Sequence, residues 1–223
     1  MAQFLGGRSK GVEFFRAMWQ MSFTHRDLFD QFEKEYSIED IEDALIYVEL
    51  KNHLIELKSI KPGNKNANVF HHFIAEVLEI VFSPQLRNPV IEHKIHDDRK
   101  RIDITFTNVS SKGFFNILSS QGIVCPFVFF ECKNFSNDPK NPDIDQLVGR
   151  FSDKRGRFGV LVCRHIEDRS RLLKRCKDVL NDNNGVIICM DDEDIGRLIE
   201  MRAEKCFQEI DDYLFQRYRD LVS

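Results

Sequence analysis

The sequence predicts an α/β protein in which helices flank a mixed β-sheet, with a small helical domain in front of it. Apolar residues recur at helical spacing over residues 69–82, which indicates an amphipathic helix. Apolar and polar residues alternate over residues 100–108, as in a strand with one buried face. Three nearly continuous apolar runs, at residues 126–134, 158–164 and 185–192, have the composition of buried central strands.

Further helices are expected between and after these strands. They cover residues 143–151 and 168–182, and one long helix that could be broken once begins near residue 193. Residues 109–125 must form an extended hairpin or a loop insertion, because the spacing between the flanking strands is longer than a tight hairpin needs. Helices that alternate with buried strands are typical of α/β folds.

Turn-forming residues at 59–68 predict a linker between two domains. The first domain, residues 1–62, is expected to be small, helical and winged-helix-like, and the second occupies residues 66–223. In the first domain we expect helices at residues 12–21, 26–35 and 38–52, and a short strand at residues 53–57. The third helix is acidic and would be repelled by DNA phosphates, so contact with a protein fits this domain better.

The composition indicates a soluble globular protein. The chain has 223 residues, 42% of them apolar, and a net charge of −4. It contains no apolar run near the roughly 20 residues that cross a bilayer, and its first residues lack the apolar stretch of a secretory signal. We therefore expect a cytoplasmic protein without a membrane role.

Local basic patches contrast with the acidic net charge. They occupy residues 93–101, 153–157 and 169–177. Such patches attract nucleic-acid phosphates, and they are equally typical of a solvated surface of mixed charge.

The cysteines and histidines show no metal-binding spacing. Neither a C-x-x-C pair nor an H-E-x-x-H pattern occurs, so we interpret the cysteines as reduced packing residues and the histidines as core-edge or surface residues. The residues concerned are Cys125, Cys132, Cys163, Cys176, Cys189, Cys206, His71, His72, His93 and His96. An acidic run at Asp191, Asp192 and Asp194 could suggest a second metal, but capping of the last helix fits it better.

A carboxylate and an ammonium group end the apolar run at residues 126–135. Glu131 and Lys133 lie two apart in the predicted strand, so they share one face, while Cys132 between them points to the other. Asp103 lies in the alternating strand that precedes this run. Two carboxylates from neighbouring strands form an oxygen-rich site that suits Mg²⁺.

With Asp103 in one strand and Glu131-x-Lys133 closing the next, residues 66–194 resemble the PD-(D/E)XK, or restriction-endonuclease-like, nuclease superfamily. Ile102 replaces the proline of the family's name. In that family the Asp and the E-x-K residues meet at one end of a sheet and hold a divalent metal for phosphodiester hydrolysis. The resemblance implies a restriction-endonuclease-like core, with Asp103 and Glu131 as metal ligands and Lys133 as the catalytic cation.

The resemblance implies further members of the site. Family members often add a helical glutamate to the metal site, for which Glu76 is favoured over Glu79, and we count Cys132 in the metal site as well. Many such nucleases place a glutamine on the helix after the E-x-K strand, which implies a catalytic role for Gln146. Exposed helix positions without a role are the alternatives for both. Arg150 lies one helical turn beyond Gln146 and is a candidate phosphate contact.

The function expected from this resemblance is a hydrolase, an Mg²⁺-dependent endodeoxyribonuclease that accepts Mn²⁺ as a substitute. The run at residues 143–164 looks like nuclease modules of prokaryotic anti-phage and restriction systems, which implies an effector role in defence. The apolar residues of the last helix have two alternative roles. They form a homodimer interface, or they pack within the chain. The first domain could bind a sensor or regulatory protein. The alternative function is a catalytically inactive nuclease-fold module for nucleic-acid binding or complex assembly, and cleavage of RNA or of one strand also stays open.

Overall fold

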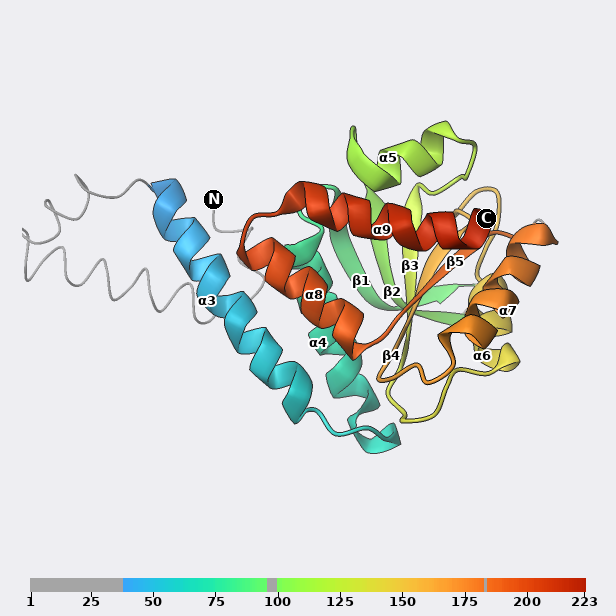
Figure 1. Cartoon of the computed structure of the whole chain (residues 1–223), viewed down its shortest axis with the longest axis horizontal. Coiled ribbons are helices and arrows are strands. Elements are labelled where there is room, and N and C mark those ends of the chain that lie inside the picture. The colour runs from blue at the N-terminus through green and yellow to red at the C-terminus, as the bar shows by residue number, and fades with distance from the viewer. Residues whose placement is uncertain (1–37, 96–99, 183) are drawn as a thin grey trace, which may run out of the picture.

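A five-stranded β-sheet, in the order β1-β2-β3-β4-β5, organises the described part of the chain (Figure 1). The computed structural model describes residues 38–95, 100–182 and 184–223, so the helices expected at 12–21 and 26–35 lie outside the described residues. The strands are β1 (Leu86–Ile95), β2 (Lys100–Asn108), β3 (Phe127–Lys133), β4 (Phe158–Cys163) and β5 (Val186–Met190). Strands β1 to β3 pair antiparallel and strands β3 to β5 pair parallel, which confirms the predicted α/β class with a mixed sheet.

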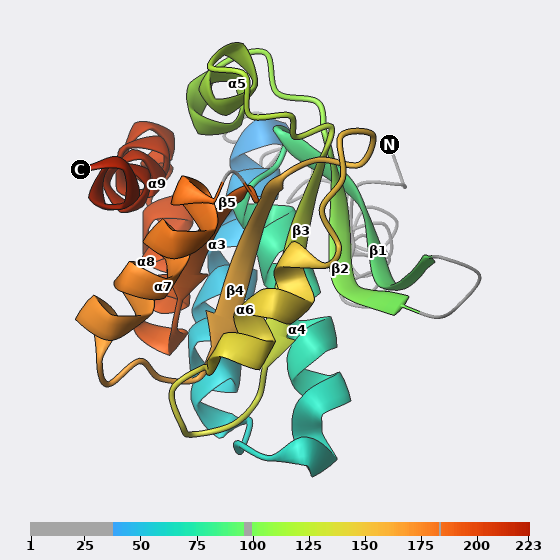
Figure 2. The ribbon, with the colours of Figure 1, turned by 90° about the vertical axis from the view of Figure 1, so that its right-hand side faces the viewer.

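Helices cover both faces of the sheet (Figure 2). The helices are α3 (Ile38–Ser59), α4 (Ala67–Val81), α5 (Gly113–Ser120), α6 (Asn141–Val148), α7 (Arg169–Asn181), α8 (Asp192–Ala203) and α9 (Phe207–Val222), with a short 3₁₀ turn η1 (Asn64–Asn66). Helix α4 packs on β1, β2 and β3, with α3 and α8 beside it, whereas α6 and α7 pack on β4 and β5. Helix α9 contacts α5, α7 and α8. Among the described residues, no helix is long and apolar enough to cross a membrane.

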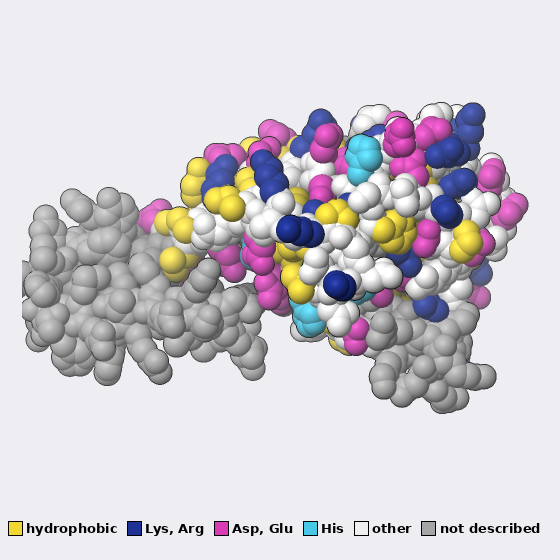
Figure 3. Space-filling model, turned by 90° about the horizontal axis from the view of Figure 1, so that it is seen from below, with side chains coloured by type: hydrophobic (Ala, Val, Ile, Leu, Met, Phe, Trp, Pro, Cys, Tyr) yellow, Lys and Arg dark blue, Asp and Glu magenta, His cyan; other side chains and the backbone are white. Residues whose placement is uncertain are grey.

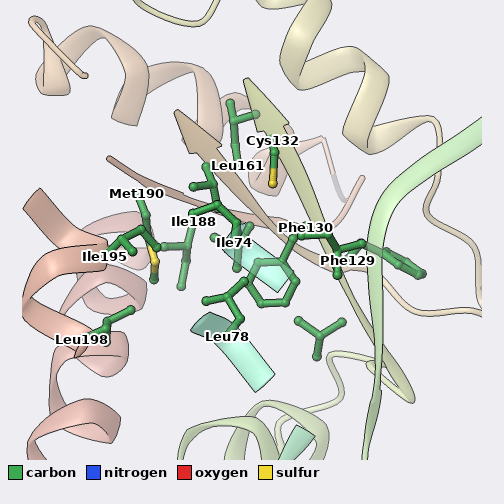
Figure 4. Close-up of a cluster of buried hydrophobic side chains, with 14 of the residues drawn as sticks. Ile74, Leu78, Phe129, Phe130, Cys132, Leu161, Ile188, Met190, Ile195 and Leu198 are labelled. Carbon is green, nitrogen blue, oxygen red and sulfur yellow. The ribbon is translucent and has the colours of Figure 1, made fainter. Parts of the chain in front are cut away.

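The apolar stripe predicted for residues 69–82 forms the inner face of α4. Ile74 and Leu78 of this stripe are completely buried and lie against Phe130 of β3 (Figure 4). The Phe130 ring also contacts Phe82, at 6.3 Å, and Phe106 of β2, at 5.6 Å between ring centroids. Burying one such side chain contributes about 1.5–3 kcal/mol, so this layer holds α4 firmly beside the end of β3.

Helix α3 is longer than the sequence predicted and packs on the rest of the body. The prediction of a strand at residues 53–57 is wrong, because these residues continue α3. Leu50 and Leu57 lie on one face of this helix, and both are buried in the core that α3 shares with the rest of the body. The expected linker is short, and hydrogen bonds fix it to the end of β3. Asn134, which comes directly after β3, donates hydrogen bonds to the carbonyl oxygens of Lys61 and Gly63, at 3.2 and 2.9 Å. In the described part of the first domain, one long helix therefore stands where a helix and a strand of a winged helix were expected.

Two elements differ from the sequence-based expectation because their patterns are irregular. Strand β1 was not predicted; its pairing with β2 shifts between Arg87 and Val90, and Asn88 and Glu92 have positive φ angles, so its side chains do not alternate regularly. Helix α5 replaces the expected hairpin or loop insertion at residues 109–125. Phe114 and Phe115 anchor this helix in the core.

The C-terminal segment forms two helices, as the possible single break predicted. Lys205, with φ of 59°, stands in the turn between α8 and α9. Asp191 caps α8, since its side chain accepts hydrogen bonds from the backbone N–H groups of Glu193 and Asp194. The apolar residues of both helices are mostly buried within the chain: Ile195, Leu198, Ile199, Ile210, Leu214 and Leu221. Packing within the chain therefore accounts for these residues.

Candidate active site

Asp103 stands where the pairing between β2 and β3 ends. The two strands pair from Thr107 and Phe127 to Ile104 and Phe130. Beyond that point, the backbone N–H of Cys132 donates a hydrogen bond of 2.8 Å to Asp103 Oδ2. The carboxylate thus replaces a backbone carbonyl as the acceptor, and it holds the two strands together at the point where they separate.

Glu131, Lys133 and Gln146 form one bonded group on the α6 side of β3. Lys133 Nζ lies 2.9 Å from Glu131 Oε1 and 3.0 Å from Gln146 Oε1. The Gln146 amide nitrogen donates to the same Glu131 oxygen. Asp143 Oδ1 forms a longer ion pair with Lys133 Nζ, at 3.6 Å. The glutamine therefore bridges the ion pair and fixes the position of both charged groups.

The local sequence of α6 explains why Gln146 reaches the site. Pro142 stands in the first turn, and the Asp143 carboxylate accepts a hydrogen bond from Lys140 N, so the helix start is well defined. Leu147 on the buried face packs over Gly159 of β4, where an added Cβ would lie 3.0 Å from Leu147 Cδ1. The absence of a side chain at Gly159 therefore lets α6 approach the sheet closely.

Burial dominates the electrostatics of Glu131. The residue is only 1% exposed, and burial together with the Asp103 carboxylate raises the pKa of Glu131 from 4.5 to about 7, against the opposing effects of Lys133 and Arg150. Burial acts to lower the pKa of Lys133, but its ion pairs with Glu131 and Asp143 carry this pKa above 10.5. Asp103, 7% exposed, lies close enough to affect both. The two buried carboxylates therefore favour the approach of positive charge.

Three polar atoms at this end of the sheet have no hydrogen-bond partner among the described residues. They are Glu131 Oε2, Arg150 Nε and His71 Nδ1 of α4, and all three are buried. Buried polar atoms without partners are uncommon in proteins and often mark a position that a ligand, a water or an ion completes. Arg150 is thus a buried member of the site beside Glu131, and it lies in the turn after α6, because the predicted helix ends at Val148 and not at residue 151.

His71 is the residue of α4 that reaches the site, and sequence reasoning missed it. Its Nε2 lies 3.2 Å from the carbonyl oxygen of Cys132 and 3.7 Å from Asp103 Oδ2. The available signal was its spacing, because His71 lies three residues before Ile74 and shares the buried face of α4. A polar residue within an apolar helical stripe can mark contact with a polar site.

Glu76 lies away from this group, whereas the thiol of Cys132 lies within electrostatic reach of it. Glu76 is exposed, and its electrostatic neighbours are His72 and residues of α3, not Asp103 or Glu131. The Cys132 side chain points into the apolar core with Ile74 and Leu78 (Figure 4), and burial raises the pKa of its thiol. The backbone N–H of Cys132 bonds to Asp103, and Asp103, Glu131 and Lys133 also affect the pKa of its thiol, although burial is the largest cause.

The donor set fits a hard divalent cation that keeps most of its water ligands. In the described ranges, no three His, Cys, Asp or Glu side chains already surround a common metal position. Mg²⁺ is usually bound through one or two carboxylates plus water and substrate phosphate, and the free Oε2 of Glu131 beside Asp103 offers such a pair.

The residues that converge at this end of the sheet are therefore Asp103, Glu131, Lys133 and Gln146, joined by Arg150 and His71. Buried carboxylates beside a lysine and an amide form an arrangement that can hold a cation, orient a water and stabilise negative charge. The chain matches no family model, no curated protein and no solved structure.

Proposed function

We propose that this chain is a divalent-metal-dependent endonuclease of the PD-(D/E)XK type, a hydrolase that cleaves phosphodiester bonds in DNA. The observation that carries the proposal is the convergence of Asp103, Glu131 and Lys133, with Gln146 bonded to two of them. The mixed sheet with α4 before it and α6 after the E-x-K strand supports a restriction-endonuclease-like core.

Asp103 and Glu131 would hold Mg²⁺, or Mn²⁺ in its place, which supplies positive charge to the phosphoryl group and acidifies a bound water. The chain prepares this site in two ways. The Cys132 N–H fixes one carboxylate oxygen of Asp103, and the ion pair with Lys133 holds Oε1 of Glu131 while Oε2 stays without a partner among the described residues. Both carboxylates are therefore oriented before substrate arrives.

Lys133 can serve both the attacking water and the scissile phosphate. Its ammonium group has three N–H donors, of which Glu131 and Gln146 each accept one. The third faces Asp143 only at the ion-pair distance of 3.6 Å, so it can be given to a phosphate oxygen or to the water. Arg150 adds a second buried positive charge where negative charge develops in the transition state.

The biological setting rests on the sequence resemblance alone. We propose an effector role in a prokaryotic anti-phage or restriction system, in the cytoplasm. The N-terminal domain, residues 1–62, would bind a sensor or regulatory protein, and a homodimer would cut both strands.

Cleavage of supercoiled plasmid tests the proposal directly. Wild-type protein with Mg²⁺ or Mn²⁺ should produce nicked or linear DNA, and EDTA should stop the reaction. Glu131→Gln and Lys133→Ala should lower the rate by at least about 100-fold, the usual effect of removing one electrostatic group from an active site. Asp145→Asn is the matched control, because Asp145 is an exposed carboxylate on the same helix as Gln146. Equal rates in wild type and all variants would exclude the proposal.

A nuclease-fold binding module is the second candidate. The observation that favours it is that Lys133 and Gln146 both bond to Glu131 Oε1 without any ligand. Such a module would bind DNA equally well in wild type and Glu131→Gln and would leave plasmid and RNA uncut with either metal. A binding assay on the same proteins therefore separates the two functions.

A further inference from the structure

Two cysteine thiols meet between α7 and β5, outside the candidate active site. Cys176 belongs to the buried face of α7, together with Leu172 and Val179. Cys189 is partly exposed, although the other residues of β5 are buried. The two sulfur atoms lie 3.5 Å apart. The packing of α7 on β5 therefore brings together two thiols that are 13 residues apart in the sequence.

This contact is close enough for a disulfide to form. A disulfide has an S–S length of roughly 2.05 Å, so the two sulfur atoms need to approach each other by only about 1.5 Å. Side-chain rotation can supply a movement of this size while α7 and β5 stay folded. The thiol of Cys163 on the neighbouring strand β4 donates instead to the carbonyl oxygen of Met190, at 3.5 Å. Cys176 is therefore the thiol that is positioned for Cys189.

A cavity gives small molecules access to both thiols. It has a volume of about 230 Å³ and lies between α7, β5 and α9, with Cys176, Cys189, Arg169 and Arg217 among its lining residues. One water molecule takes up roughly 30 Å³ in the liquid, so water and a peroxide of similar size fit in this space. Figure 3 shows basic and acidic side chains together at the right-hand end of the body, where α6 and α7 lie, so this flank faces water.

The surroundings keep Cys189 protonated in the absence of an oxidant. Its contact with the Cys176 thiol and its burial raise the pKa of Cys189, and the charge of Arg169 opposes this effect. Because a thiolate reacts much faster than a thiol, the pair stays reduced until an oxidant is present in excess.

We propose that Cys176 and Cys189 form a reversible disulfide when the protein meets a peroxide. The partly exposed Cys189 reacts first: its sulfur attacks one peroxide oxygen, the O–O bond breaks, and a sulfenic acid and one water form. The Cys176 sulfur then attacks the sulfur of the sulfenic acid, so that the S–S bond forms and a second water leaves. Both thiols are oxidised, one peroxide is reduced to two waters, and the two thiol hydrogens end in these waters. A dithiol reverses the step by thiol–disulfide exchange.

The disulfide would add a covalent link between α7 and β5. Arg169 in the first turn of α7 already pairs with Asp191 and Asp194 at the start of α8, at 2.7 and 3.0 Å. The new bond would fix α7 further and would restrict the unfolded chain, which stabilises the folded state. In a reducing compartment such a disulfide is transient and acts as a redox sensor.

Peptide mapping of the reduced, full-length protein before and after treatment with hydrogen peroxide tests this inference. Free thiols are blocked before digestion so that disulfides do not rearrange. We expect a cross-link between Cys176 and Cys189, with the loss of two hydrogen atoms in mass. We also expect Tm to rise by about 5–10 °C, and dithiothreitol should reverse both changes.

Cys189→Ser and Cys176→Ser should abolish the cross-link and the rise in Tm. Cys206→Ser is the matched control, because Cys206 is also partly exposed but lies in the turn between α8 and α9, so this variant should keep both changes. Since Cys189 is partly exposed, its variant tests the pair even where Cys176→Ser does not fold.

Two results would overturn the inference. One is oxidised wild-type protein without a link between Cys176 and Cys189, and the other is an equal rise in Tm for wild type and Cys189→Ser. Either result leaves the nuclease proposal unaffected, because its plasmid assay uses the reduced protein.

Discussion

The carboxylate of Asp103 accepts a hydrogen bond from the backbone N–H of Cys132, over 2.8 Å, at the point where β2 and β3 stop pairing. Glu131 and Lys133 flank Cys132 on the same strand, so this single bond places Asp103 beside both. The candidate site therefore depends on where the hydrogen-bonded pairing of β2 and β3 ends, and not only on which residues the strands carry.

Asp103→Asn separates the structural role of this residue from its proposed chemical role. The asparagine oxygen can still accept the Cys132 N–H, so we expect the thermal stability to change little. The negative charge is lost, so the cleavage rate should fall by at least about 100-fold. Parallel measurement of Tm and plasmid cleavage checks this, and a variant that retains full cleavage would remove Asp103 from the site.

Gln146→Ala should reduce activity without unfolding the protein. The amide bridges Lys133 and Glu131, and without it both side chains gain freedom to leave their positions. We expect a fall in kcat of about 10-fold or more, as for a small displacement of a catalytic group. Single-turnover cleavage, compared with the exposed neighbour variant Asp145→Ala, measures it. If the two variants lose the same activity, Gln146 has no positioning role.

Gly159→Ala should displace α6. The new Cβ would lie 3.0 Å from Leu147 Cδ1, which is tighter than ordinary packing, so we expect a loss of about 1–3 kcal/mol in unfolding free energy and lower cleavage. Gly196→Ala is the matched control. Its Cβ would meet Leu54 only at 3.9 Å within α8, so this variant should gain about 0.5–1 kcal/mol. Urea denaturation of both variants tests the prediction, which fails if Gly159→Ala is as stable as wild type.

Asp192 should make the stability of the protein depend on pH. Burial raises the pKa of Asp192 from 3.8 to about 6, even though Arg164 donates a hydrogen bond of 2.8 Å to it and opposes the shift. Between pH 3.8 and about 6, Asp192 binds more protons in the folded state than in the unfolded state. Its contribution to the free energy of unfolding is therefore fully present below pH 3.8 and is lost as the pH rises through about 6.

Asp192→Asn removes this proton binding. Relative to wild type, the variant should therefore gain on the order of 2 kcal/mol of unfolding free energy as the pH rises from about 4 to about 7. Urea denaturation of both proteins across this pH range measures the difference. A constant difference at every pH would show that Asp192 has an ordinary pKa in the folded protein.

Local patterns in the amino-acid order were sufficient to predict most of the regular elements after residue 66, but not β1 or α5. Helix α4 and strands β2 to β5 were predicted because burial of one face, or of both, leaves a local period in the order of apolar residues. The same local rule put Glu131 and Lys133 on one face of β3, since alternation is a property of any strand.

Long-range packing decides which helix residues reach the site and which faces of the helices and strands contact one another. Glu76 and His71 lie on the same helix, yet the packing of α4 turns His71 toward Asp103 and Glu76 toward α3. The bulged strand β1 and helix α5 were missed because contacts with distant residues stabilise them, such as the hydrogen bond from Phe114 N to Asp211 of α9. Local periodicity records which face is buried, but it carries no information about the partner that buries it.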